Sequence, residues 1–304
     1  MEKKKFLSIG GLLLCTLFWS INVALARSYT SEIPPLILSL IRWCGAFMIL
    51  LPFTYKDLKP VLDYFYRNPF QLLILSLFSI TLYNTLQYFA SVTTQSININ
   101  LMITLNPPIT ILLALIINRV RYTLRGTIGM LLALLGTVNI LVQGEWSNLF
   151  KVNFVPGDLI MLVAVICWGI YSVMLNKYSI KLKPLPLYTA IIFMGTLFLL
   201  IIHFIVGDES NYSFKVDHLP IYIYLWIFPS ILSNIFWFQG VKEIGASSAS
   251  LFLYTMPVYG TIIGIYILGE SFRQFHLIGG LFILVGFILN FINGNSWKRF
   301  FSKK

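Results

Sequence analysis

Arg42 is the residue in this sequence whose type and position point most directly to chemistry. It lies about eight residues into the apolar stretch 35–54, where an arginine costs roughly 2.5–3.5 kcal/mol if the stretch crosses a bilayer. A guanidinium can bind a carboxylate or a phosphate through two parallel hydrogen bonds. We therefore expect Arg42 to bind an acidic group of a small molecule. The alternative is a structural arginine that reaches toward the bilayer surface or donates to backbone carbonyls at a helix break.

Polar and aromatic side chains recur in other apolar stretches at spacings of three or four residues, which place them on one face of a helix. These residues are Trp19 with Asn22, Asn84 with Gln87 and Tyr88, Asn100 with Thr104, Trp168 with Tyr171, Asn234 with Trp237, and Ser250 with Tyr254. Polar groups within a bilayer usually face a cavity or the bundle interior. We expect the set to line one substrate-binding cavity with Arg42. For any single residue, a hydrogen bond between helices, worth about 0.6 kcal/mol, is the alternative.

Prolines and glycines mark where these stretches bend or pack closely. Pro107 and Pro257 lie inside apolar stretches, where a proline removes a backbone hydrogen bond and kinks the helix. We expect each to free carbonyls for the cavity or to serve as a gating kink, with a simple packing kink as the alternative. Four glycines, spaced seven apart in two pairs, predict close helix contacts rather than substrate binding. They are Gly129, Gly136, Gly279 and Gly286.

The elements that position these residues are predicted to be membrane-spanning helices. The chain has 304 residues, of which 58% are hydrophobic and 11% charged, whereas soluble domains carry about 25% charged residues. Ten apolar stretches are each long enough to cross a bilayer core. They cover residues 6–26, 35–54, 70–89, 98–117, 125–143, 157–175, 186–206, 220–239, 247–268 and 275–294. The fold class is therefore an all-α polytopic membrane protein with ten spans, and the short connections leave no room for a soluble catalytic domain.

The distribution of basic residues predicts the orientation. With the N-terminus in the cytoplasm, 17 of the 22 lysines and arginines fall on the cytoplasmic side, as the positive-inside rule requires. Both termini are then cytoplasmic, and the chain resides in the cytoplasmic membrane. The net charge of +11 thereby serves topology, so we expect no nucleic-acid partner. The partners expected are a small-molecule substrate and the lipid bilayer.

The sequence also contains an internal repeat with an offset of 149 to 150 residues. Trp19 matches Trp168, Asn84 matches Asn234, and Pro107 matches Pro257, while the four glycines match in pairs. The two units, residues 1–145 and 156–304, would contain five spans each. Because five is odd, the second unit enters the membrane in the opposite sense, which is a transporter architecture. One chain then holds a complete pathway, so a monomer suffices, and a homodimer stays open.

Several of these motifs resemble the EamA branch of the drug/metabolite transporter superfamily. The motifs are Trp19-Ser20-X-Asn22, Arg42, the run from Ala249 through Pro257 to Leu268-Gly269-Glu270, and Gly279-Gly280 to Gly286. The resemblance covers essentially the whole chain and implies a ten-helix inverted-repeat carrier of small solutes, often an exporter. The first unit departs from the pattern, since Arg119-Val120 stands where the second unit has Gly269-Glu270. Any role of that acidic residue can be placed only at Glu270.

The residues that are missing narrow the function. No Asp or Glu lies deep in a span, and exchange of a cation for protons usually needs such a carboxylate. The sequence therefore favours a facilitator or exchanger of a small metabolite that is amino-acid-like, neutral, zwitterionic or anionic. The alternative is a multidrug or organic-cation exporter of the same fold. A membrane-embedded enzyme would be of another class, but no converging catalytic constellation is present. We expect neither a metal nor a cofactor, and no Walker A motif indicates ATP as the direct driving force.

Overall fold

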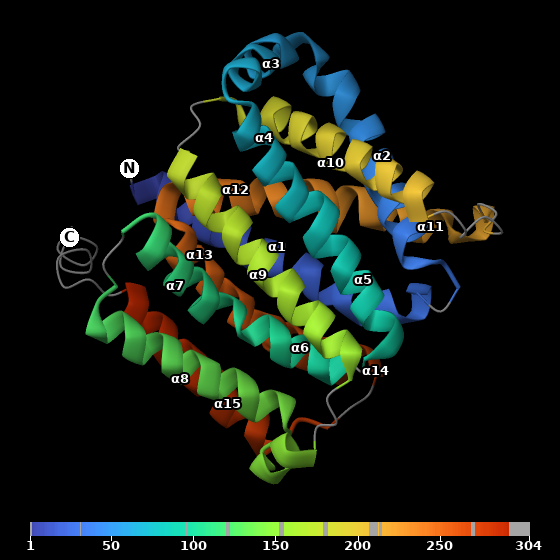
Figure 1. The fold of residues 1–304 in the computed structure, drawn as a ribbon. Helices are drawn as coiled ribbons and strands as arrows, with labels where there is room; N and C mark the ends of the chain where they lie inside the picture. The colour runs from blue at the N-terminus through green and yellow to red at the C-terminus, as the bar shows by residue number, and fades with distance from the viewer. Residues whose placement is uncertain are drawn as a thin grey trace.

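The computed structural model describes residues 2–30, 32–94, 96–119, 122–151, 155–178, 182–206, 212, 215–268 and 271–291. Throughout this described part, all regular secondary structure is helical (Figure 1). The first half contains α1 (Glu2–Thr30), α2 (Pro35–Thr54), η1 (Tyr55–Asp57), α3 (Leu58–Arg67), α4 (Pro69–Ser76), η2 (Leu77–Tyr83), α5 (Asn84–Thr93), α6 (Ser96–Thr104), α7 (Asn106–Ile117) and α8 (Leu124–Leu141). The second half contains η3 (Trp146–Lys151), α9 (Pro156–Tyr178), α10 (Pro184–Val206), η4 (Val216–His218), α11 (Leu219–Leu225), η5 (Trp226–Leu232), α12 (Ser233–Ile244), α13 (Ala246–Ser250), η6 (Leu251–Thr255), α14 (Met256–Leu268) and α15 (Gln274–Phe291).

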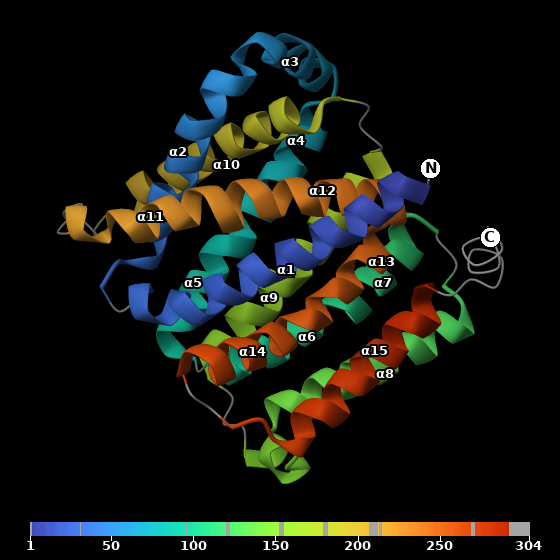
Figure 2. The ribbon, with the colours of Figure 1, turned by 180° about the vertical axis from the view of Figure 1, so that it is seen from behind.

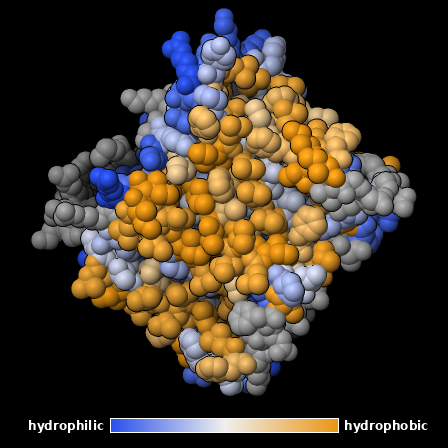
Figure 3. All heavy atoms as spheres, in the orientation of Figure 1, coloured by the Kyte–Doolittle hydropathy of each residue, from blue (hydrophilic) through white to orange (hydrophobic). Residues whose placement is uncertain are grey.

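The helices have the length and composition of membrane spans. Among the described residues, eight helices are long and apolar enough to cross a bilayer, and Gln274–Asn290 is a shorter apolar helix. Each of the ten predicted stretches contains helix, although the count of ten spans stays a prediction. The face of the molecule seen in Figure 3 is broadly apolar, and large apolar side chains such as Leu131 on α8 and Leu281 on α15 are exposed. An all-α polytopic membrane protein explains this surface, because lipid tails replace water around it.

The glycine pairs bring α8 and α15 into close contact, and the two helices lie side by side in both views (Figures 1 and 2). A methyl group placed on Gly129 would lie 2.7 Å from the backbone oxygen of Gly286. On Gly136 it would lie 2.5 Å from the backbone oxygen of Gly279. A side chain at either position would therefore push the helices apart, which is why small residues occur at such interfaces.

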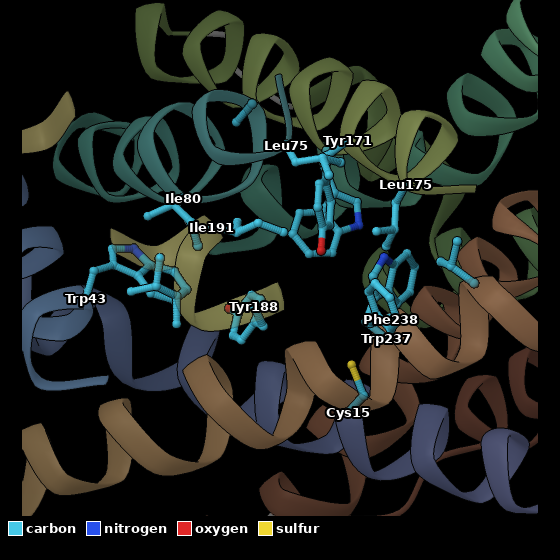
Figure 4. Close-up of a cluster of buried hydrophobic side chains, with 14 of the residues drawn as sticks. Cys15, Trp43, Leu75, Ile80, Tyr171, Leu175, Tyr188, Ile191, Trp237 and Phe238 are labelled. Atoms are coloured by element: carbon cyan, nitrogen blue, oxygen red, sulfur yellow. The ribbon is translucent and has the colours of Figure 1, made fainter. Parts of the chain in front are cut away.

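The core is built where α1, α2, α9, α10 and α12 face one another (Figure 4). Tyr171 of α9 and Tyr188 of α10 point into it, and Trp237 of α12 closes one side. All three side chains are at most 1% exposed. Large aromatic groups in the centre of the bundle fix the separation of the helices around the cavity described below.

Two π-helical segments interrupt spans at matching positions. The segment η2 covers Leu77–Tyr83, and η5 covers Trp226–Leu232, which are 149 residues apart. In η5, Pro229 has no N–H to donate, so the regular hydrogen-bond pattern cannot continue through it. Such segments leave carbonyl groups that side chains must satisfy, and they occur frequently at functional sites.

The two prolines singled out in the sequence lie at helix breaks rather than within continuous helices. Pro107 is in the first turn of α7, just after the interruption at Leu105. Pro257 is the second residue of α14 and follows the 3-10 segment η6. Both positions suit proline, because the first turn of a helix needs no N–H donor there. Glu270 lies outside the described residues.

Candidate functional site

A small buried cavity lies at the centre of the bundle, between helices of both halves of the chain. Its walls are formed by Trp19, Asn22, Val23, Arg42, Tyr83, Asn84, Gln87, Trp168, Asn234 and Met256. These residues come from α1, α2, η2, α5, α9, α12 and α14. The side chains leave room for about one water molecule. A larger ligand therefore requires the helices to separate, and this conformation is closed around the cavity.

Arg42 is the charged group in the cavity wall, and it is 1% exposed. Its Nε donates to the Ser230 hydroxyl at 2.6 Å, Nη1 donates to the Tyr88 hydroxyl at 3.0 Å, and Nη2 donates to the Pro229 carbonyl at 3.2 Å. The guanidinium also lies over the ring of Trp43, 4.8 Å from its centroid. These three bonds use three of its five N–H groups.

The oxygen atoms that hold Arg42 are all uncharged. Among the described residues, no carboxylate forms an ion pair with Arg42. A buried guanidinium without a counter-charge is costly, and its two remaining N–H groups have no hydrogen-bond acceptor within that part of the chain. The arrangement leaves this charge ready to bind an anion.

The π-helical segment η5 supplies the acceptors for Arg42. The Pro229 carbonyl accepts hydrogen bonds from Trp19 Nε1 at 3.1 Å and from Asn234 Nδ2 at 3.1 Å, in addition to the one from Arg42. The Ser230 hydroxyl donates in turn to the Leu225 carbonyl at 2.6 Å, which fixes its lone pairs toward Arg42. In the first half, Asn84 Nδ2 donates to the Ser79 carbonyl of η2 at 2.7 Å. Each asparagine thus satisfies a carbonyl released by its own π segment.

Three tryptophans close one side of the cavity. Ring centroids are 5.1 Å apart for Trp19 and Trp168, 5.3 Å for Trp168 and Trp237, and 5.4 Å for Trp19 and Trp237. Trp237 Nε1 donates to the Ser172 hydroxyl at 3.2 Å, which holds this ring behind the other two. The contact between Trp19 and Trp168 joins residues that occupy matching positions in the sequence repeat.

Two polar atoms of the cavity wall have no partner within the described residues. They are Asn22 Oδ1, an acceptor, and Trp168 Nε1, a donor. The hydroxyl of Tyr171, whose ring lies 5.0 Å from that of Trp168, is also buried and unpaired within the same part of the chain. Buried polar atoms are nearly always hydrogen-bonded. These groups therefore indicate a ligand, or water, that offers both a donor and an acceptor.

The structure brings together most, but not all, of the residues predicted for the site. Gln87 lines the cavity, and Tyr88 and Trp237 touch residues that do. Four others lie away from it: Asn100, Thr104, Ser250 and Tyr254. Tyr254 belongs to a separate buried cluster with Ile111 of α7 and Met130 of α8. The hydroxyl of Ser250 donates to the backbone carbonyl of Ser247 at 2.9 Å. The hydroxyl of Thr104 donates to the backbone carbonyl of Leu101 at 2.6 Å.

Several residues that shape the site were not predicted from the sequence. Pro229 and Ser230 hold the guanidinium, and Trp43, Tyr83 and Met256 complete the surroundings. A proline inside an apolar stretch was the available signal for Pro229, since it marks backbone carbonyls that need other donors. Nothing in the local pattern marks the other residues as neighbours of Arg42.

A wider and more open depression lies at one end of the bundle. Tyr122, Asn176, Ser247 and Asn290 are among the residues that line it. The Tyr122 hydroxyl donates to Asn290 Oδ1 at 2.5 Å, and burial raises the pKa of Tyr122 to about 12. The phenol therefore stays protonated as a donor at neutral pH. In the predicted orientation, this end of the bundle faces the cytoplasm.

Comparison with known proteins places these observations in a family. The sequence profile of the EamA-like transporter family matches residues 7–142 and again 155–292. The uncharacterized transporter YyaM of Bacillus subtilis is 28% identical over 244 residues, covering 79% of this chain and 77% of that protein. An uncharacterized transporter of Archaeoglobus fulgidus is 24% identical over 278 residues, covering 84% and 95% respectively. A protein of known crystal structure shares the fold with a TM-score of 0.71 at 18% identity, covering 95% of this chain and 98% of that one.

Proposed function

Since this chain belongs to the EamA-like transporter family, we propose that it moves a small metabolite with an acidic group through the central cavity by alternating access. The chain is a multi-pass membrane transporter of the EamA type. The class of substrate and the mechanism of transport are what we propose. The observation that carries it is Arg42, which is buried in the cavity wall, held by uncharged oxygens, and left with two N–H groups for an anion.

The unpaired polar atoms of the cavity refine the class of substrate. A carboxylate would accept from Arg42 and from Trp168 Nε1, while Asn22 Oδ1 requires a donor from the substrate. A zwitterion supplies both kinds of group on neighbouring atoms. We therefore favour an amino-acid-like metabolite over a simple anion, and the three tryptophans supply an apolar wall for its remaining part.

The proposed mechanism rests on two inverted repeat units, residues 1–145 and 156–304. The sequence matches Gly129 with Gly279 and Gly136 with Gly286. In space Gly129 instead faces Gly286 and Gly136 faces Gly279. Crossed contacts of this kind are those that a two-fold axis between two equivalent units produces. They support a carrier whose units exchange conformations around a central site.

The orientation and direction are likewise proposed. Both termini would face the cytoplasm in the cytoplasmic membrane, on the evidence of the basic residues. The wider depression then faces the cytoplasm while the central cavity is closed, which is consistent with loading from inside and export. A single chain supplies all the helices around the cavity, which supports transport by a monomer.

A multidrug or organic-cation exporter is the second candidate, and the three tryptophans favour it. Their rings could attract a cation through its interaction with the aromatic faces. Against it, Arg42 is the charged side chain among the described residues lining the cavity, and it would repel a cation. An enzyme of the membrane is disfavoured by the family to which the chain belongs.

A thermal-unfolding screen of purified protein tests the proposal. The ligands would be amino acids and nucleotides paired with their decarboxylated or dephosphorylated forms, together with organic cations. A ligand at 100 times its dissociation constant stabilises by about 2.7 kcal/mol. We expect stabilisation by the acidic member of a pair alone, and its loss in Arg42→Ala. The matched control is Arg125→Ala, which removes an exposed arginine at the start of α8.

The outcome that contradicts the proposal is equal stabilisation of wild type and Arg42→Ala, most plainly by organic cations. In that case Arg42 is structural and a drug exporter becomes the better interpretation of the function. Counterflow of the identified ligand in proteoliposomes then separates transport from binding alone. An enzyme would convert the ligand without exchanging it across the bilayer.

A further inference from the structure

The helix α3, which connects α2 to α4, has three distinct stripes of side chains. Val61 and Phe65, four residues apart, pack into the protein and are 2% and 3% exposed. Leu62 and Tyr66 form a second stripe and are 56% and 90% exposed. A third stripe is charged and consists of Lys59, Asp63 and Arg67. Only the first stripe is explained by packing within the chain.

The helix lies at one extremity of the molecule and is joined to its neighbours by polar contacts (Figures 1 and 2). The Tyr64 hydroxyl donates to Gln71 Oε1 at 2.6 Å, and Asn68 Nδ2 donates to the Tyr64 carbonyl at 3.0 Å, which joins α3 to α4. At its other end, Lys183 Nζ pairs with Asp57 at 2.9 Å. With Val61 and Phe65 packed inward, the other two stripes face the surroundings of the protein.

The position of α3 relative to the spans places it at the bilayer surface. The helix α2 has 20 residues, or about 30 Å at 1.5 Å per residue. This already matches the roughly 30 Å of a hydrocarbon core, so α3, which follows α2 and η1, lies where the chain has left the core. Phe53 and Phe70, just before and after it, are 76% and 75% exposed, as expected of side chains that contact lipid.

The charges around the exposed apolar stripe are mainly positive. Asp57 is paired with Lys183, which leaves Lys56, Lys59 and Arg67 facing solvent with Asp63. Figure 3 shows the hydrophilic tip of the molecule directly beside its apolar surface. An amphipathic helix with exposed apolar groups and neighbouring cations is the pattern that binds anionic lipid surfaces.

We propose that α3 is an in-plane helix and that Lys59 and Arg67 of α3, together with Lys56 of η1, bind the headgroups of anionic phospholipids. Leu62 and Tyr66 enter the boundary between headgroups and acyl chains. The three cations bind the phosphate groups of the leaflet at that surface. The site is separate from the central cavity, so it does not depend on the proposed substrate.

Titration of the delipidated full-length protein in detergent with phosphatidylglycerol or phosphatidylcholine of the same chain length tests this site. The readout is the lipid dependence of the thermal midpoint. The test variant is Lys56→Gln/Lys59→Gln/Arg67→Gln. The control is Arg125→Gln/Lys177→Gln/Lys242→Gln, which removes the same charge from exposed positions at the ends of other helices. All six positions are exposed, so the substitutions should leave the fold intact.

Wild type and the control variant should prefer phosphatidylglycerol, and the test variant should not. Each cation near an anionic surface contributes about a fivefold preference (about 1 kcal/mol), so the preference should fall by up to about a hundredfold. Leu62→Asn/Tyr66→Asn should weaken the binding of both lipids equally. Two results overturn the proposal: an unchanged preference in the test variant, or competition by soluble glycerol phosphate at the same concentration as the lipid. The second would indicate a free-phosphate site.

Discussion

Ser230→Asp offers a direct test of whether Arg42 is a buried charge that awaits an anion. The hydroxyl of Ser230 lies 2.6 Å from Arg42 Nε, so a carboxylate at this position would reach the guanidinium. An ion pair between this carboxylate and Arg42 would form where the wild type has only uncharged acceptors. We expect Ser230→Asp to be tolerated in the wild-type background and to be strongly destabilising in Arg42→Ala.

The magnitude follows from burial of both groups, since Arg42 is 1% exposed and Ser230 is 0% exposed. Removing one partner of a buried ion pair typically costs about 3–5 kcal/mol, because the other charge is left uncompensated. A double-mutant cycle between Ser230→Asp and Arg42→Ala should therefore give a coupling free energy of about 3 kcal/mol. Ser230→Asn, which has the same size without the charge, should give less than about 1 kcal/mol in the same cycle.

The assay is reversible unfolding in mixed micelles for the variants of the cycle, with the Asn series beside it. A carboxylate ligand found by the thermal screen should also lose at least tenfold in affinity for Ser230→Asp, since about 1.4 kcal/mol of competition suffices for that. The reasoning is refuted if the Asp and Asn cycles give the same coupling. That result would mean that the side chain at position 230 does not reach Arg42 or that the guanidinium is already neutralised.

Three further predictions concern the helices around the site. Gly279→Ala should destabilise by about 1–3 kcal/mol, because its methyl group would meet the Gly136 backbone oxygen at 2.6 Å; the adjacent Gly280→Ala, with open space around it, should be neutral in the same unfolding assay. Tyr122→Phe should cost about 1 kcal/mol at neutral pH. Because burial raises the pKa of Tyr122 from 10 to about 12, its contribution is complete below pH 10 and disappears as the pH rises through 12, so the difference between wild type and variant should vanish there. Asp158→Ala should cost about 3 kcal/mol, because the buried carboxylate accepts from Thr94, from Asn98 Nδ2 at 3.1 Å and from the Val155 N–H at 2.8 Å; Asp158→Asn, which keeps an acceptor, should cost less.

The helical membrane fold could be predicted from composition and span length. The position of Arg42 as a charged residue within an apolar span could be predicted in the same way. An arginine amid apolar residues has to be buried in the bundle or reach its edge, whatever the details of packing. The hydrogen-bond partners of Arg42 could be predicted only in part. Tyr88 lies on a polar helix face, which spacing reveals, whereas Ser230 approaches Arg42 because of the π-helical geometry of η5. The same geometry occurs in η2, which contains no proline, and residue periodicity does not express it.

The placement of Tyr254 shows how a local change of helix type defeats a spacing argument. Ser250 and Tyr254, four residues apart, share a face if the helix turns by 100° per residue. The segment Leu251–Thr255 is instead a 3-10 helix, which turns by about 120° per residue. Over four residues the difference accumulates to about 80°. Ser250 and Tyr254 therefore do not share a face, and both lie away from the cavity that holds Arg42, with Tyr254 in the buried cluster that includes Met130.

The uncharged partners of Arg42 are themselves an argument for transport. A resident carboxylate would satisfy the guanidinium permanently, and a substrate would have to break a buried ion pair costing about 3–5 kcal/mol to bind. Hydroxyl and carbonyl acceptors stabilise the charge by less, about 1.5–3 kcal/mol for a hydrogen bond to a charged group. Two of the five N–H groups of Arg42 donate to none of these acceptors, so a substrate can bind them without breaking a hydrogen bond. An incoming carboxylate can therefore compete, and after it departs the same acceptors keep the empty site from carrying a wholly unsolvated charge. The acceptors at Pro229 and Ser230 lie in the second half of the chain and Arg42 in the first. Substrate binding would thus weaken a contact between the halves at the place where alternating access requires them to move.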